Sequence, residues 1–249
     1  MIKAILTRRL WIIRNRLFST FGILLLLPVF LHTIINLPLK RMVVNPLWNI
    51  SHEQWIFPGL VIIVAFVMMM PIIYRDFFDL RLHNKLLPSL ALAPVSKTKF
   101  LYSFLVAVII ESAVYIVITI WIFSLIMFPL LSVLDYLIMF PFILLFIGLG
   151  ANIFITLSLI IDRTTLFSIL MLTFFIFIIF GSGLIVEFEF FPALIGDILR
   201  YLPTGQIMQS LRMAIFSSTF NWLIIALSLI SIIVWTYING VIFAKKVYK

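Results

Sequence analysis

The stretch FLYSFLVAVIIESAVYIVITIWIF, residues 100–123, is apolar almost throughout and carries a single charged residue, Glu111. It is long enough to cross a hydrocarbon core about 30 Å thick, which takes ~20 apolar residues in a helix. Lipid offers the backbone no hydrogen-bond partner, so each such run is expected to be helical. Five further runs of this kind predict six membrane-spanning helices in all, at Phe18–Leu37, Pro58–Tyr74, Phe100–Phe123, Tyr136–Ile160, Thr165–Leu184 and Trp222–Phe243.

The composition agrees with a membrane protein. Of the 249 residues 64% are hydrophobic and only 11% are charged, about half the charge of an ordinary soluble domain. The chain contains no cysteine, which excludes disulfides, thiolate metal sites and a cysteine nucleophile. Six helices and their loops account for the whole length. The sequence therefore predicts an all-α integral membrane protein with one domain, residues 1–249.

The basic residues predict the orientation of that domain. Six spans place both termini on one side of the membrane, and all but four of the 18 lysines and arginines fall on that side. Positive residues favour the cytoplasmic side, so both termini are expected in the cytoplasm and the protein in a plasma membrane, such as a bacterial inner membrane. The net charge of +9 is thus a topology signal, and no nucleic-acid partner is expected. The four exceptions are Lys40, Arg41, Arg200 and Arg212.

Three segments outside the spans are too apolar for solvated loops. Residues 1–16 place apolar side chains at helical spacing, which predicts an amphipathic helix on the cytoplasmic leaflet or, alternatively, a simple charged flank of the first span. Residues 75–99 predict a short cytoplasmic helix that needs a protein groove or the membrane interface. Residues 186–221 contain five charges and two helix-breaking prolines, Pro192 and Pro203, and predict two short helices that dip partway into the outer leaflet.

In this order the segments resemble the transmembrane subunit of ABC-2-type ATP-driven exporters. The resemblance covers essentially the whole chain and rests on five features: the amphipathic N-terminus, "FPGL" (57–60) entering the second span, "YRD" (74–76) leaving it, "LAPVSKTKF" (92–100) entering the third, and "FFP" (190–192) with "LPTGQIMQSLR" (202–212) before the sixth. The resemblance implies a homodimer, or a pair of similar subunits, bound to two cytoplasmic ATPase subunits. It further implies that the inner-loop helix couples to the ATPase through Arg81, Leu82, Lys85, Leu86, Leu87 and Leu90.

The chain itself lacks the motifs for ATP hydrolysis. There is no G-x-x-x-x-G-K-[ST] phosphate loop, so ATP and Mg²⁺ are expected on the partner ATPase and no cofactor on this chain. The three histidines are scattered over separate segments and show no metal-ligand spacing, and no G-x-S-x-G nucleophile motif is present. The expected function is that of a permease, with no catalytic residue, moving a lipid-like, glycoconjugate, peptide or drug substrate.

Glu111 is the candidate polar site within the membrane. A carboxylate near the middle of a span is costly and is by default a functional candidate. One interpretation is an ion-gradient-driven carrier or channel that uses Glu111 as its proton or cation site. The other is a structural glutamate, neutral or bonded to a polar neighbour such as Asn152 of the fourth span. A third possibility for the protein is a non-transporting membrane assembly factor.

Overall fold

A computed structural model describes this chain, except for residues 43–49, 83–95, 129–130 and 248–249. The described part is helical and contains no strand. Six of its helices are long and apolar enough to cross a membrane, as the sequence predicts, and the protein is a multi-pass membrane protein. They lie at Leu17–Lys40, His52–Leu82, Lys97–Ile126, Val133–Ile160, Thr164–Gly181 and Trp222–Lys246.

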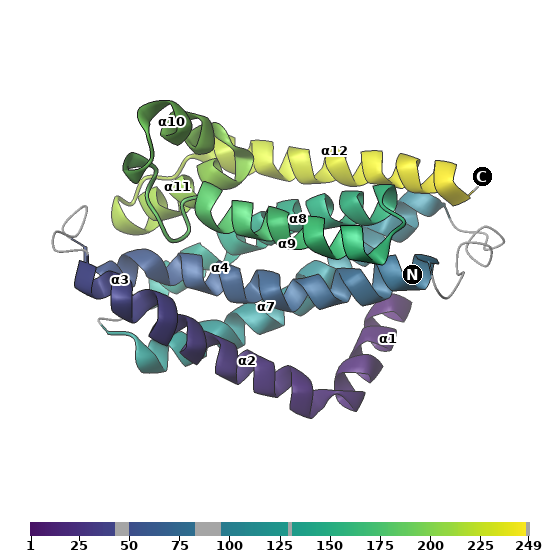
Figure 1. The fold of residues 1–249 in the computed structure, drawn as a ribbon, viewed down its shortest axis with the longest axis horizontal. Coiled ribbons are helices and arrows are strands. Elements are labelled where there is room, and N and C mark those ends of the chain that lie inside the picture. Colours follow the sequence, from purple (N-terminus) through teal and green to yellow (C-terminus); the bar gives the residue numbers. More distant parts are fainter. Residues whose placement is uncertain (43–49, 83–95, 129–130, 248–249) are drawn as a thin grey trace.

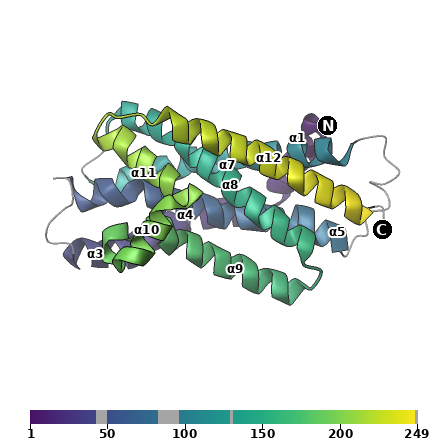
Figure 2. The same ribbon diagram turned by 90° about the horizontal axis from the view of Figure 1, so that it is seen from above.

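The long helices run side by side along the long axis of the molecule, and both termini lie at the same end (Figure 1, Figure 2). The most buried are α4 (His52–Ile73) and α8 (Val133–Ile160), which form the centre of the bundle. By contrast α2 (Leu17–Leu31), α9 (Thr164–Gly181) and α12 (Trp222–Val247) leave most of their apolar side chains exposed. In a membrane these outward faces contact lipid, whose tails are as apolar as the side chains themselves.

Three of the long helices have a serine as the N-cap residue. Ser51 accepts a hydrogen bond from the backbone N–H of Gln54 at the start of α4. Ser96 does the same for Lys99 at the start of α7 (Lys97–Ile126), and Ser132 forms a reciprocal capping box at the start of α8. These bonds satisfy backbone donors that a helix cannot satisfy internally.

The second span extends further than the sequence suggests. The predicted cytoplasmic loop begins at residue 75, whereas helical structure continues through a π-helical turn, η3 (Tyr74–Asp79), into α5 (Leu80–Leu82). The reason is packing, because Phe77 and Phe78 are buried and Phe78 stacks on Phe167 of α9 with 4.1 Å between ring centroids. The first span likewise continues from α2 through a π-helical turn, η1 (His32–Asn36), into α3 (Leu37–Met42).

Two short helices lie between the fifth and sixth spans, where the sequence predicts them, and their position in the outer leaflet stays a prediction. A short 3₁₀ turn, η4 (Phe188–Phe190), leads into α10 (Ala193–Tyr201), and α11 (Pro203–Phe216) follows after a single residue. Both lie at the end of the bundle opposite the termini (Figure 1). Helix α11 packs against α8 and α12, whereas α10 exposes Leu194, Ile198 and Tyr201.

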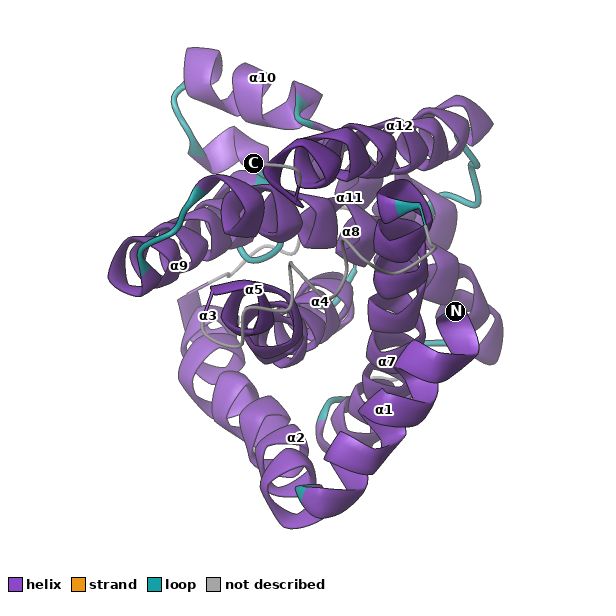
Figure 3. Ribbon diagram, turned by 90° about the vertical axis from the view of Figure 1, so that its right-hand side faces the viewer, coloured by secondary structure: helices purple, strands orange, loops and turns teal. Residues whose placement is uncertain are grey.

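The N-terminal helix α1 (Ile2–Asn15) runs at a steep angle to the long helices and packs against α7 (Figure 1, Figure 3). Its exposed side chains include Leu10 and Trp11, and its one buried residue is Arg9. The half-buried face also holds Ile5, Leu6 and Ile13, whereas Arg8 and Arg14 are exposed, so α1 is amphipathic and Arg9 is the exception on its inner face. This arrangement suits a helix whose outer face meets lipid and whose inner face meets a charge within the protein.

Candidate functional site

Glu111 belongs to a buried cluster of charged side chains. It projects from α7, and the guanidinium of Arg9 from α1 donates two hydrogen bonds to its carboxylate, Nε to Oε2 at 2.6 Å and Nη2 to Oε1 at 2.6 Å. The hydroxyl of Tyr115, one turn further along α7, donates a third to Oε1 at 2.6 Å. The parallel two-bond contact between arginine and carboxylate is among the strongest ion pairs that proteins form.

The same arginine also contacts Asp76. Asp76 lies in the π-helical turn at the end of the second span, and Nη1 of Arg9 donates a hydrogen bond to its Oδ2 atom. Two further arginines approach the other oxygen of Asp76, Arg8 at 3.6 Å and Arg75 at 3.3 Å. Arg9 therefore connects three elements distant in sequence: α1, the end of the second span, and the middle of the third span.

Burial and charge act in opposite directions on Arg9. Burial lowers the pKa of the guanidinium, but the hydrogen bonds and negative charges of Glu111 and Asp76 raise it above its ordinary value, so Arg9 is charged. Arg9, Asp76 and Glu111 are each less than 8% exposed, and removing Arg9 alone would leave Glu111 as a buried carboxylate without a counter-ion. The arrangement is a clamp between helices; its carboxylate oxygens are already occupied.

The predicted partner of Glu111, Asn152, lies elsewhere. Asn152 of α8 faces α12, where Asn239 donates hydrogen bonds to its side-chain oxygen at 3.2 Å and its backbone carbonyl at 3.3 Å. Thr236 of α12 donates to the same side-chain oxygen at 3.1 Å. These bonds join two spans inside the membrane, and they leave Asn152 no contact with Glu111 in the described structure.

The sequence contained a signal for the partnership of Arg9 that its interpretation missed. In a helix Arg9 falls in the middle of the stripe formed by Ile2, Ile5, Leu6 and Ile13, the stripe expected to face apolar surroundings. A charge in such a position requires an opposite charge across the contact. Glu111, as the single acid of its span, is the obvious one.

Two cavities flank the clamp. One, of about 210 Å³, lies between α1, α2 and α7, and its lining includes Leu6, Phe21 and Ile118 beside Arg9 and Glu111. The other, of about 110 Å³, lies on the side of Asp76. It is lined by charged, aromatic and two aliphatic residues: Ile5, Arg8, Arg9, Asp76, Phe77, Leu80, Arg81, Phe100, Phe104 and Phe243.

Arg81, a predicted ATPase contact, forms a second ion cluster at the same end of the bundle. Its Nη1 atom donates to Asp162 at 2.6 Å and its Nη2 atom to the carbonyl of Ile161 at 2.6 Å. Lys246 of α12 donates to the same Asp162 oxygen at 3.0 Å. Partial burial raises the pKa of Asp162, but the bonds from Arg81 and Lys246 outweigh it and lower that pKa below its ordinary value.

This cluster fixes the point at which the second span leaves the bundle. Arg81 is buried and Leu82 is half-buried, so both are packed within this chain. The other predicted contacts, Lys85, Leu86, Leu87 and Leu90, lie outside the described residues. Their contact with an ATPase stays a prediction.

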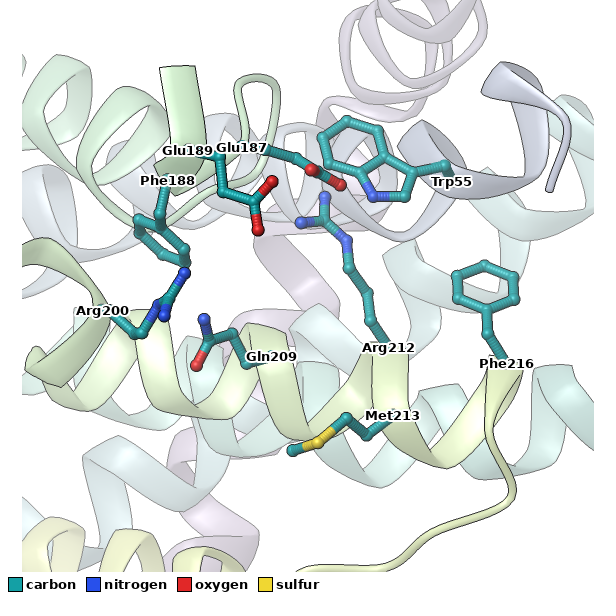
Figure 4. Close-up of a pocket in the computed structure, with 9 residues that line it drawn as sticks. All are labelled: Trp55, Glu187, Phe188, Glu189, Arg200, Gln209, Arg212, Met213 and Phe216. Carbon is teal, nitrogen blue, oxygen red and sulfur yellow. The ribbon is translucent and has the colours of Figure 1, made fainter. Parts of the chain in front are cut away.

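A third polar site lies at the opposite end of the bundle (Figure 4). A cavity of about 330 Å³ opens between the start of α4, the η4 turn and the helices α10 and α11. Its centre is Arg212 of α11, whose guanidinium lies 3.7 Å from the ring centre of Trp55. The lining is completed by Glu187, Phe188, Glu189, Arg200, Gln209, Met213 and Phe216.

The charges of this cavity are balanced, two arginines against two glutamates. Burial raises the pKa of Glu187, although nearby Arg212 and a hydrogen bond with Trp55 oppose the shift. Burial lowers the pKa of Arg212 to about 9, against the charge of Glu187, so Arg212 is still protonated at neutral pH. Glu189 is exposed at the mouth of the cavity.

Neither polar end of the bundle offers a metal site among the described residues, where no three histidine, aspartate or glutamate side chains group as metal ligands. A comparison of the chain with family models, with characterised proteins and with solved structures found no significant match.

Proposed function

We propose that this protein is the permease subunit of an ATP-driven exporter of the ABC-2 type. The observation that supports the proposal is the order of the elements along the chain: an N-terminal helix, six long apolar helices, and two short helices before the sixth. The apolar segment after the second long helix is read from the sequence. A permease of this type works with cytoplasmic ATPase subunits, which hold ATP and Mg²⁺, and with a second copy or a paralogue of itself. Its substrate is amphipathic, and both termini face the cytoplasm.

The state of Glu111 favours this function over an ion-gradient-driven carrier. A coupling carboxylate has to bind and release its ion in every cycle. Glu111 instead accepts three hydrogen bonds of 2.6 Å, two of them from an arginine that stays protonated at any physiological pH. Releasing Glu111 for an ion would leave Arg9 and a carboxylate buried without each other, so the pair is better suited to holding α1 against α7.

The test is whether an ATPase binds through the inner segment. The tagged protein is purified from the membranes of its source organism, and co-purified ATPase is detected by its vanadate-sensitive ATP hydrolysis. The double variant Leu86→Asp/Leu87→Asp places two charges in an apolar contact, which costs several kcal/mol, and is expected to lose the ATPase.

The control is Arg163→Asp, which changes the net charge by the same two units at an exposed position of a different cytoplasmic loop. It is expected to keep the ATPase. If no ATP-hydrolysing subunit accompanies the unaltered protein, or if the double variant binds it undiminished, the exporter assignment is wrong.

A further inference from the structure

The cavity around Arg212 contains hydrogen-bond donors that the protein does not use. Nε of Arg200 and both Nε and Nη2 of Arg212 are buried and find no hydrogen-bond acceptor among the described residues. Native proteins pair nearly all buried polar atoms, and an unpaired charged donor is especially costly. Three guanidinium nitrogens without an acceptor, on two arginines that line one cavity, indicate an acceptor group that comes from outside the chain.

The geometry of Arg212 is fixed in advance of any ligand. The face of its guanidinium lies on Trp55, which is itself buried and forms a hydrogen bond with Glu187. With its guanidinium held in this way, Arg212 lies among the side chains that line the cavity (Figure 4). A planar, immobilised guanidinium matches the oxygens of a phosphate better than any other side chain does.

The two glutamates indicate that the ligand also carries a positive charge. Glu187 is already engaged with Trp55, whereas Glu189 is exposed at the mouth, and its carboxylate points towards the cavity (Figure 4). A ligand with only negative charge would be repelled by Glu189. A phosphate with a short arm ending in a primary ammonium satisfies both signs, and a volume of about 330 Å³ accommodates such a group.

The surroundings of the cavity indicate where that group comes from. Helix α10, which carries Arg200, exposes Leu194 by 76%, Ile198 by 58% and Tyr201 by 75%. Phe190 of the neighbouring η4 turn is 70% exposed. Apolar side chains in such number beside a charged cavity suit an amphiphile, whose tails lie along α10 while its head group enters the cavity.

We propose that this cavity binds the head group of an aminophospholipid, with the phosphate on Arg200 and Arg212 and the primary ammonium on Glu189. Lipid binding at this site needs no ATPase. The lipid-binding test can therefore succeed or fail independently of the test of the exporter assignment. The lipid is either a resident of the outer helix pair or the class of molecule that the pathway handles. In both cases the cavity has to bind the same phosphate and ammonium groups.

Native mass spectrometry of the delipidated protein measures this binding directly. Phosphatidylethanolamine and phosphatidylglycerol with identical acyl chains are titrated, together with soluble glycerophosphoethanolamine. The unaltered protein is expected to bind phosphatidylethanolamine more tightly than phosphatidylglycerol. It is expected to bind the soluble head group at least about tenfold more weakly, because that molecule lacks acyl chains to bury.

Two conservative variants test the two halves of the site. Arg200→Gln is expected to weaken both lipids about tenfold, the effect of losing one charged hydrogen bond. Glu189→Gln, at an exposed position, is expected to abolish the preference for phosphatidylethanolamine. The control Asp197→Asn, exposed on the same helix, is expected to change neither affinity.

Unchanged lipid binding by Arg200→Gln overturns the site. Equal affinity of the unaltered protein for the two lipids overturns the role of Glu189. If glycerophosphoethanolamine binds as tightly as the lipid, the ligand is a soluble phosphoamine and the assignment to a lipid is wrong.

Discussion

Replacing Arg9 with methionine is the sharpest perturbation of the buried clamp. Methionine keeps much of the length and apolar character of the arginine stem but removes every donor. Glu111 then keeps only the hydroxyl of Tyr115, whereas Asp76 still has Arg8 and Arg75 within 3.6 Å. The damage therefore concentrates on Glu111, a buried carboxylate without its counter-ion.

The expected loss of unfolding free energy is about 3–5 kcal/mol, the usual cost of removing one partner of a buried ion pair. A second change, Glu111→Gln, removes the stranded charge and is expected to restore about 1–3 kcal/mol in the Arg9→Met background. Because the two residues act as one unit, the double variant should be more stable than the sum of the single effects predicts. The neighbouring Arg8→Met is the matched control. Its side chain is 49% exposed and lies 3.6 Å from Asp76, so it should cost less than about 1 kcal/mol.

Equilibrium unfolding is measured in mixed micelles, titrated with sodium dodecyl sulfate and followed by tryptophan fluorescence. It gives the unfolding free energies of the unaltered protein, of Arg9→Met, of Glu111→Gln and of the double variant. A local measurement supports it. The chain has no cysteine, so a single Leu6→Cys in the half-buried face of α1 should react faster with a maleimide once Arg9 is replaced. The clamp is refuted if Arg9→Met costs no more than Arg8→Met, or if Arg9 and Glu111 show no coupling in the double-variant cycle.

Two further predictions concern the arrangement of the bundle. A cysteine at exposed Asp197 should react with an impermeant maleimide in intact cells, and one at exposed Lys245 only after permeabilisation; the reverse pattern contradicts the topology. A methyl group at Gly59 would lie 2.2 Å from the backbone oxygen of Leu184, so Gly59→Ala should lower the unfolding free energy by about 1–3 kcal/mol. Gly22→Ala, with no atom within 4 Å, should cost nothing, and equal costs for the two variants would contradict the packing of α4.

The spans were predictable because length and hydropathy alone define them. The sequence places the third span at residues 100–123 and the structure at Lys97–Ile126, a difference of a few residues at each end. The second span was underestimated for a physical reason. Its last turns contain Asp76 and Arg81, which hydropathy counts as polar, yet both are buried against opposite charges.

Partners across the bundle were less accessible to sequence reasoning. Glu111 was recognised as costly, and Asn152 was named as an example of a polar neighbour that could bond to it. In the structure Asn152 faces α12. The partner of Glu111 is Arg9, which precedes Glu111 by 102 residues and belongs to α1, a helix too polar to be predicted as a span. Which face of a membrane helix meets which neighbour depends on packing that no local pattern encodes.

The order of Arg9 and Glu111 along the chain bears on the insertion of the third span. A carboxylate at the centre of a span opposes insertion by about 2.5–3.5 kcal/mol, which the third span offsets with its many apolar residues. Since Arg9 precedes Glu111 by 102 residues, it leaves the ribosome long before the third span does. Arg9 is therefore synthesised before Glu111 and is available to pair with it when the third span inserts. A chain without Arg9 would bring Glu111 into the bundle as a buried carboxylate with no counter-ion.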